Sequence, residues 1–457
     1  MTCKLGVDVG GTFTDFFLWT EDGSVSTYKT LSTPADPSVG VLDGLQHIAE
    51  DQGIDLAEFA GRITTIVHGT TVTTNATLTR NGAKTGLLTT RGVRDALEMR
   101  RGVREEQYNN RLTNVVPLVP RYLRAPVTGR LDYKGVEVDG LDLDDVRAAT
   151  ELFANEGVEA VAICFMNSFA NQAHEQAAAE VVRAELPDAF LSVSSEVLPT
   201  IRFYNRVSTT VLNSYVGPIL RDYLVSLTDK LAGIGFTGVL LIMQSNGGVA
   251  LPGVSVTRPA ATLLSGPAGG PKAAAAYTRA AGSDDCIVVD MGGTSFDASL
   301  VRSGEAAMYQ ESDVARLRIA LPMLAIITIG AGGGSIGWID EGGLLRMGPQ
   351  SAGADPGPAC YGRGGELPTC TDANVVLGYL DPAYFAGGTI ALSADEARKA
   401  ITARIGEPLG VQVEEAAAGM YRVINTNMAH GVREITVERG LDPRDFPMVV
   451  AGGAGSL

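Results

Sequence analysis

The stretch Asp8-Val-Gly-Gly-Thr-Phe-Thr-Asp15 follows the pattern Asp-x-Gly-Gly-Thr-x-x-Asp, which returns about 280 residues later as Asp290-Met-Gly-Gly-Thr-Ser-Phe-Asp297. Apolar residues precede and follow each copy, so each predicts a strand, a tight glycine turn and a second strand. Paired glycines let backbone N–H groups approach an anion, because no Cβ stands in the way. A single hairpin of this kind is common in sheet proteins, whereas two matching copies favour a nucleotide site made by duplication.

Each position of the pattern has a chemical role at a polyphosphate. We expect Asp8 and Asp290 to be catalytic and to hold Mg²⁺, since that ion prefers carboxylate oxygens. The groups around them are expected to bind the phosphates of ATP from opposite walls of a cleft. These candidate cofactor-binding residues are Gly10, Gly11, Thr12, Thr14 and Asp15 in the first copy and Gly292, Gly293, Thr294, Ser295 and Asp297 in the second.

The two hairpins resemble the phosphate motifs of the actin-like ATPase superfamily. A third element of that superfamily, a glycine-rich adenosine loop, is matched by Ala451-Gly-Gly-Ala-Gly455, which adds Gly452, Gly453 and Gly455 as candidates. The resemblance implies an α/β fold of the ribonuclease H-like kind, with duplicated domains around a nucleotide cleft. In that superfamily a helix follows the adenosine loop, so the stop at Leu457 predicts that a C-terminal part is missing.

Size and charge narrow the class of protein. A chain of 457 residues with 45% hydrophobic residues can fill two sizeable cores. The net charge of −16 argues against nucleic acid or an anionic membrane as the main partner, because both need a basic surface. No apolar run reaches the roughly 18 residues of a spanning helix, and no signal segment precedes the first motif, so we expect a cytoplasmic protein.

The order of elements predicts α/β layering. Residues 63–67 and 158–165 are typical of strands and residues 143–156 of a helix, while residues 208–231 predict a long helix before a strand at 238–243. Residues 100–140 predict an irregular excursion outside the core. The Gly/Pro-rich stretch 328–365 predicts a structured, backbone-rich site, since such a long loop in a compact domain is usually functional or disordered.

His68 is a third candidate catalytic residue. It precedes Gly-Thr-Thr at the predicted end of a strand, where a helix N-terminus could bind an anion or a substrate carbonyl. The alternative is a histidine hydrogen-bonded into the turn, and the residues alone leave both interpretations open.

Further strings resemble one branch of the superfamily, the hydantoinase/oxoprolinase family, and within it the A-type chains. They span most of the sequence and include His68-Gly-Thr-Thr-Val-Thr-Thr-Asn75, Ser265-Gly-Pro-Ala-Gly269, Ile329-Gly-Ala-Gly-Gly-Gly-Ser-Ile336, Gly357-Pro-Ala-Cys-Tyr-Gly362 and Glu438-Arg-Gly-Leu-Asp-Pro443. The resemblance implies an N-terminal hydantoinase A-type domain at 1–200 and an ATPase domain at 201–457. The sequence departs from the family at Ala325 and Ile327, where many relatives have Asp and His.

The family resemblance implies an ATP-dependent enzyme with a B-type partner subunit. Such enzymes open cyclic amides (hydantoins, 5-oxoproline, lactams) or carboxylate ketones such as acetone and acetophenone. We expect phosphorylation of a carbonyl oxygen leading to hydrolysis of a cyclic amide, with ketone carboxylation as the alternative. A kinase that releases a stable phosphorylated product and a nucleotide-binding scaffold without turnover are further alternatives; the second is favoured by Ala325 and Ile327.

Overall fold

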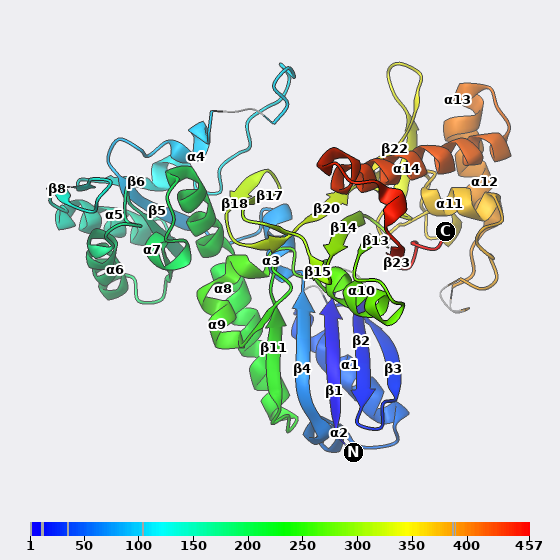
Figure 1. Ribbon diagram of the computed structural model, residues 1–457, viewed down its shortest axis with the longest axis horizontal. Helices are drawn as coiled ribbons and strands as arrows, with labels where there is room; N and C mark the ends of the chain where they lie inside the picture. The colour runs from blue at the N-terminus through cyan, green and yellow to red at the C-terminus, as the bar shows by residue number, and fades with distance from the viewer. Residues whose placement is uncertain (1, 11–12, 34–35, 103–104, 386–387, 389) are drawn as a thin grey trace. The chain divides into compact units, whose positions relative to one another are not determined.

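The computed structural model describes residues 2–10, 13–33, 36–102, 105–385, 388 and 390–457, so the candidate residues Gly11 and Thr12 lie outside the described part. The chain forms two compact mixed α/β units, each with its own sheets and core (Figure 1). Unit 1 comprises Met1–Ala268 with Met308–Met323, and unit 2 comprises Gly269–Ala307 with Leu324–Leu457.

These units divide the chain differently from the regions 1–200 and 201–457 expected from the sequence. The long helix α8 (Phe203–Gly233) and the strand β11 (Val239–Met243) both belong to unit 1. The physical reason is strand pairing, because β11 pairs in parallel with β4 (Ile63–Thr70) and so extends the N-terminal sheet.

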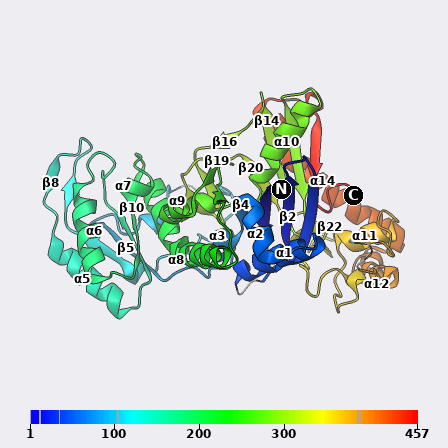
Figure 2. The ribbon, with the colours of Figure 1, turned by 90° about the horizontal axis from the view of Figure 1, so that it is seen from below.

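The N-terminal sheet of unit 1 has six strands in the order β12-β11-β4-β1-β2-β3. Side chains of β1 (Cys3–Val9) and β2 (Phe13–Thr20) alternate between buried and exposed, as expected for strands with one covered face. Their buried side chains form one core with α1 (Pro37–Asp51) and α8, which lie along the same face of the sheet (Figure 2).

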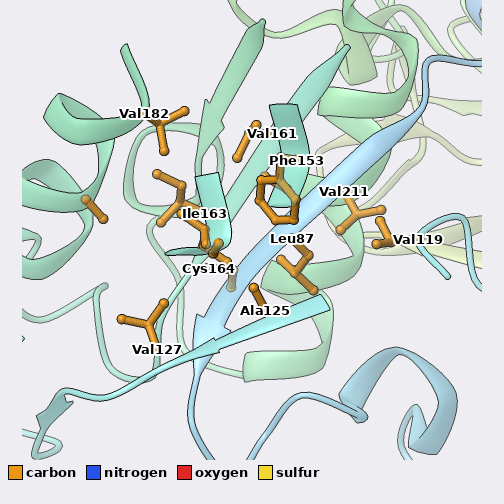
Figure 3. Packing of buried hydrophobic residues seen from close by; sticks show 14 of the residues in the cluster. Leu87, Val119, Ala125, Val127, Phe153, Val161, Ile163, Cys164, Val182 and Val211 are labelled. Atoms are coloured by element: carbon orange, nitrogen blue, oxygen red, sulfur yellow. The ribbon is translucent and has the colours of Figure 1, made fainter. Parts of the chain in front are cut away.

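A second sheet of unit 1 has four strands in the order β10-β9-β5-β6. Its central strand β9 (Ala160–Cys164) is buried along its whole length, because helices cover the parallel sheet. Phe153, Ile163 and Val211 meet in this core (Figure 3). The edge strand β6 (Arg124–Val127) lies inside the stretch expected to be an irregular excursion, so that expectation is wrong for these four residues.

The main sheet of unit 2 repeats the strand arrangement around the first motif. Strand β13 (Cys286–Met291) pairs antiparallel with β14 (Phe296–Arg302) and in parallel with β23 (Met448–Ala451). In unit 1, β1 pairs antiparallel with β2 and in parallel with β4 in the same way. The first and last residues of each Asp-x-Gly-Gly-Thr-x-x-Asp pattern therefore lie on an antiparallel pair of consecutive strands, as the sequence predicts.

The remaining elements connect and cover these sheets. In unit 1 they are β3 (Val25–Leu31), α2 (Leu56–Arg62), α3 (Val72–Leu78), β5 (Thr85–Thr90), α4 (Ala96–Met99), β7 (Arg130–Leu131), β8 (Glu137–Asp139), α5 (Leu143–Asn155), α6 (Ala173–Glu185), β10 (Phe190–Val193), α7 (Ser194–Val197), β12 (Val249–Ala250), α9 (Pro252–Thr257), β16 (Met308–Tyr309), β17 (Ser312–Val314) and β18 (Leu317–Ile319). In unit 2 they are α10 (Gly269–Ala280), β15 (Glu305–Ala306), β20 (Ile326–Ile329), β21 (Ser335–Ile339), β22 (Leu345–Ser351), α11 (Cys370–Val376), α12 (Ala394–Ile401), α13 (Glu407–Leu409) and α14 (Val413–Ile435). Among the described residues, no helix is both long and apolar enough to cross a membrane.

Candidate functional site

The first hairpin places its two aspartates side by side. Asp8 on β1 lies directly opposite Asp15 on β2. Lys29, the neighbour of Asp15 on β3, approaches the Asp15 carboxylate at 2.7 Å and neutralises it in part. The turn begins at Gly10, whose N–H donates to the Phe13 carbonyl at 3.0 Å.

Thr14 stabilises this turn from the core side. Its side chain is fully buried, and its Oγ1 lies 3.1 Å from Ser32 Oγ. The Ser32 hydroxyl in turn donates to the Gly10 carbonyl at 2.8 Å. Thr14 was expected to contact the nucleotide, and the structure gives it these contacts within the protein.

The second hairpin repeats this geometry with different neighbours. Asp290 on β13 lies opposite Asp297 on β14, and the Gly292 N–H donates to the Ser295 carbonyl at 3.0 Å. Apart from the adjacent residues in the chain, no atom of the described residues lies within 4 Å of the position that a Cβ would take on Gly292 or Gly293. The glycine tip therefore leaves open the space that a bound phosphate needs.

The Asp290/Asp297 pair has unusual electrostatics. Burial raises the pKa of Asp290 above its ordinary value. Burial, together with the negative charge of Asp290, raises the pKa of Asp297 to about 6, against the hydrogen bond that the Thr328 hydroxyl donates to it. No Lys or Arg among the described residues forms an ion pair with either carboxylate, so a divalent cation would relieve their repulsion.

The glycine-rich run predicted as a backbone site packs directly on the second hairpin. The N–H groups of Gly333 and Gly334 donate to the carbonyls of Gly292 and Gly293 at 3.1 and 2.6 Å. A Cβ on Gly332 would lie 2.7 Å from the Gly293 carbonyl carbon, so only glycine permits this approach. The run was expected to form a site, but its contact with the hairpin could not be predicted, because they are separate in sequence.

The loop after β23 lies beside the same hairpin. Ala451 pairs with Asp290 across the parallel strands, and the Ala454 N–H donates to the Met291 carbonyl at 3.0 Å. Gly452 has a positive φ of 86°, and a Cβ there would collide with the Asp290 carboxylate. The structure thus brings the candidates Gly452, Gly453 and Gly455 together with the second hairpin.

His68 lies within β4, two residues before the end of the strand, which the sequence expected to finish at residue 67. Its ring is fully buried, and its Nε2 lies 2.7 Å from the Tyr223 hydroxyl on α8. Its Nδ1 has no hydrogen-bond partner in the described part of the chain. Burial lowers the pKa of His68 to about 4, so the imidazole is neutral at pH 7.

A cavity of about 660 Å³ opens beside the first hairpin within unit 1. It is lined at one end by Val9 and Gly10, and along its walls by residues of α3 and α8 that include Tyr223. The cavity lies at the carboxyl ends of the parallel strands β1 and β4, where α/β sheets commonly bind ligands. Sequence reasoning missed Tyr223, since its position in a long apolar helix gives no local signal.

The residues that depart from the family pattern carry apolar side chains inside unit 2. Ala325 is buried, and its N–H donates to the Ala307 carbonyl at 2.8 Å. Ile327 pairs with Ala298 across β20 and β14 and packs against the unit 2 core. No group of three or more His, Cys, Asp or Glu side chains in the described ranges is arranged to hold a metal ion.

Two family models match this chain, one on each side of residue 200. The model described as Hydantoinase/oxoprolinase matches residues 206–457, and that of the hydantoinase/oxoprolinase N-terminal region matches residues 4–186. The chain therefore belongs to the hydantoinase/oxoprolinase family.

Individual relatives cover almost the whole chain. The caprolactamase alpha subunit of Pseudomonas jessenii is 44% identical over 99% of this chain and 66% of its own length. The acetophenone carboxylase gamma subunit of Aromatoleum aromaticum is 36% identical over 99% of this chain and 63% of its own length. The crystal structure of the ATP-dependent caprolactamase from Pseudomonas jessenii matches with a TM-score of 0.89 and 43% identity, over 99% of this chain and 66% of that chain. This chain thus spans about two thirds of the length of these relatives.

Proposed function

We propose that this chain binds ATP and Mg²⁺ and transfers the γ-phosphoryl group to the carbonyl oxygen of a cyclic amide. It acts as the A-type component of a complex that then hydrolyses the ring. The observation that carries this proposal is the duplicated hairpin, in which each copy has two aspartates opposite each other, together with the open glycine tip of the second copy. Membership of a family that includes an ATP-dependent caprolactamase supports the reaction class.

The residues present fit a metal–nucleotide complex. The Asp290/Asp297 pair offers carboxylate oxygens, which are the ligands that Mg²⁺ prefers, and no Lys or Arg of the described residues pairs with them. The open space over Gly292 and Gly293 admits phosphate oxygens to within reach of backbone N–H groups. We propose that Asp8 supplies the matching carboxylate from the first hairpin.

The repeated strand arrangement supports an actin-like ATPase fold with duplicated domains. In this proposal the two hairpins bind one triphosphate, and the loop at Gly452 contacts the adenosine. Phosphoryl transfer needs positioning and charge neutralisation more than covalent help from the protein. Backbone N–H groups at the two tips and the aspartates Asp8 and Asp290 perform that role here.

The chemistry of the reaction is a phosphoryl transfer followed by hydrolysis. The amide oxygen forms a bond to the γ-phosphorus while the bond from that phosphorus to ADP breaks. A first water then adds to the activated carbon and the ring C–N bond breaks, which leaves an acyl phosphate and a free amine. A second water hydrolyses the acyl phosphate to a carboxylate and inorganic phosphate. Bound Mg²⁺ would neutralise charge on the phosphates. We propose that a B-type subunit completes the hydrolysis, which the names of the multi-subunit relatives support.

Substituting the motif aspartates tests the proposal. Asp8→Asn and Asp290→Asn each keep the size of the side chain but remove a metal ligand, so ADP release in the presence of a lactam should fall at least 100-fold. Asp188→Asn, at an exposed turn of unit 1, serves as the control and should retain activity. Unchanged turnover in both hairpin variants would refute the assignment.

Ketone carboxylation is the second candidate function, and the likeness to the acetophenone carboxylase gamma subunit favours it. The two reactions differ in the fate of carbon. A carboxylase incorporates labelled carbon from bicarbonate into an acid product, whereas an amidohydrolase yields an unlabelled amino acid. Mass spectrometry of the product from labelled bicarbonate therefore separates them.

A further inference from the structure

We propose that the cavity beside the first hairpin binds the substrate of the proposed reaction, and that it selects an uncharged cyclic amide over one that carries a carboxylate. The reaction in this inference is taken from the proposed function. The class of ligand is argued from the residues that line the cavity. The cavity adjoins Gly10, so a carbonyl held there lies next to the tip that we assign to the phosphates.

The charge of the lining argues for a neutral ligand. Asp36 and Asp222 both line the cavity, the described lining contains no Lys, Arg or His, and Arg221 outside the lining already pairs with Asp222 at 2.9 Å. Lys230 holds the Asp36 carboxylate at 2.5 Å, and that contact lowers the pKa of Asp36, so this residue stays ionised. A substrate with its own carboxylate would find no unpaired cation among the described residues at the cavity, because Lys230 and Arg221 are already bound to the two aspartates.

The hydrogen-bonding groups of the lining argue for an amide. Buried Tyr223 lines the cavity, and its hydroxyl lies 2.7 Å from His68 Nε2. If the proton of His68 sits on Nδ1, a buried N–H donor has no partner, whereas a proton on Nε2 leaves only an unpaired acceptor, which costs less. We therefore assign the proton to Nε2, which donates to the Tyr223 oxygen.

This tautomer leaves the proton of the Tyr223 hydroxyl for another acceptor, and in our proposal that acceptor is a ligand in the cavity. A carbonyl oxygen is the acceptor that such a donor binds, and the N–H of a lactam can donate to a carboxylate of the lining. A ketone offers only the first of these bonds. His68 is thus a positioning residue that acts through Tyr223.

Two ligands with the same ring, one neutral and one charged, show whether the cavity selects by charge or by shape. 2-Pyrrolidone and 5-oxoproline are the same five-membered lactam, and only the second carries a carboxylate. Calorimetric titration of the protein without ATP should show 2-pyrrolidone binding at least tenfold more tightly. Equal affinity, or tighter binding of 5-oxoproline, would overturn the inference.

Two tyrosine variants locate the binding site. Tyr223→Phe removes one hydrogen bond and should weaken 2-pyrrolidone binding about fivefold. Tyr215→Phe is the matched control, because it is the same change at another buried position of α8 that does not line this cavity, and it should bind normally. Normal binding by Tyr223→Phe would place the ligand elsewhere.

Variants of His68 test its role as a positioning residue. His68→Gln keeps an N–H donor for the Tyr223 oxygen and should retain affinity within twofold, whereas His68→Met removes the donor and should behave like Tyr223→Phe. Thermal unfolding of both variants checks that they are folded. Wild-type affinity in folded His68→Met would overturn the assignment of His68.

The binding experiment and the turnover experiment test different proposals, so one proposal can be wrong while the other stands. If 2-pyrrolidone binds as expected but no lactam stimulates ADP release by the complete complex, the proposed function is wrong and the cavity assignment stands. If a lactam stimulates ADP release and Tyr223→Phe leaves KM unchanged, the function stands and the cavity assignment is wrong.

Discussion

At the scale of single residues, the two copies of the pattern are chemically different. Lys29 balances Asp15 in the first hairpin, whereas Asp290 and Asp297 face each other in unit 2, where the described residues give Asp297 a hydrogen bond from the Thr328 hydroxyl and no ion pair. The five fixed positions of the pattern are the same in both copies, and the difference in charge comes from the neighbouring strands. We infer that the second hairpin provides the stronger attraction for a cation.

Asp297 should make the stability of unit 2 depend on pH. Its pKa is about 6 in the folded chain and ordinarily 3.8, so between these values the native state binds more protons and stability falls as pH rises. Above pH 6 Asp297 is ionised in the folded chain, and its full destabilising effect is present. Asp297→Asn removes it and should raise the free energy of unfolding by about 2 kcal/mol at pH 7.5, with no gain at pH 4.

Urea unfolding at the two pH values, without Mg²⁺ or nucleotide, measures this effect. Glu366→Gln removes an exposed carboxylate of the same unit and should change stability little at either pH. A gain from Asp297→Asn that is the same at both pH values would contradict the assigned cause.

Gly293 offers a test of nucleotide binding that is separate from folding. Its Cβ position is open and its φ is not positive, so Gly293→Ala should change stability by less than about 0.5 kcal/mol. The added methyl would occupy phosphate space, and ATP affinity should fall at least tenfold by titration calorimetry. Gly61→Ala, on the exposed side of α2, should bind ATP normally.

His68 shows why part of the site could not be read from the sequence. Its partner Tyr223 is 155 residues away, and no local pattern connects a strand histidine to a tyrosine on a long helix. The hairpins were predictable because the strands, the turn and the paired aspartates are all contiguous. Contacts between segments that are distant in sequence, such as Gly334 with Gly293, can be identified only from the folded structure.

At the scale of elements, helices with clear periodicity were predicted well and buried polar strands were not. The helix expected at 143–156 is α5 (Leu143–Asn155), and that expected at 208–231 is the core of α8. Strand β6 was not predicted, because Arg124 and Pro126 interrupt the apolar pattern that indicates a buried strand. The Arg124 side chain is nonetheless buried, since its Nε donates to the Val119 carbonyl at 2.9 Å.

Asp372 holds together the segment that supports the glycine-rich run. Its buried carboxylate accepts hydrogen bonds from the N–H groups of Cys360 and Thr369 at 2.7 and 2.8 Å, and from the Thr369 hydroxyl at 2.8 Å. Asp372→Asn replaces one carboxylate oxygen, which accepts hydrogen bonds from these groups, by an NH₂ group, which cannot accept them. We expect a loss of about 2 kcal/mol in the free energy of unfolding.

Urea denaturation measures this loss, and Asp395→Asn at the exposed start of α12 is the control. The neighbouring Thr371 bonds the Gly333 carbonyl through both its N–H and its hydroxyl at 2.8 Å. ATP affinity should therefore fall together with stability in Asp372→Asn. Equal stability of the two variants would show that the segment is held by other contacts.

At the scale of the molecule, each unit has a core of its own, so we expect two unfolding transitions in calorimetry. If one Mg–ATP contacts both hairpins, as we propose, nucleotide should raise the temperatures of both transitions. At 100 times Kd the stabilisation is about 2.7 kcal/mol. A shift confined to one transition would mean that a single hairpin binds the nucleotide.

The chain passes between the units three times, because Met308–Met323 leaves unit 2 to join unit 1. Val314, Leu317 and Ile319 of this segment are buried against unit 1, and Ser208 on α8 donates to the Arg318 carbonyl at 2.7 Å. A protease cut between residues 268 and 269 would therefore give two fragments. The N-terminal fragment lacks Met308–Met323, which is part of the core of unit 1, and the C-terminal fragment carries that segment. The severed pieces should stay associated on a sizing column, and two polypeptides expressed apart should complement each other.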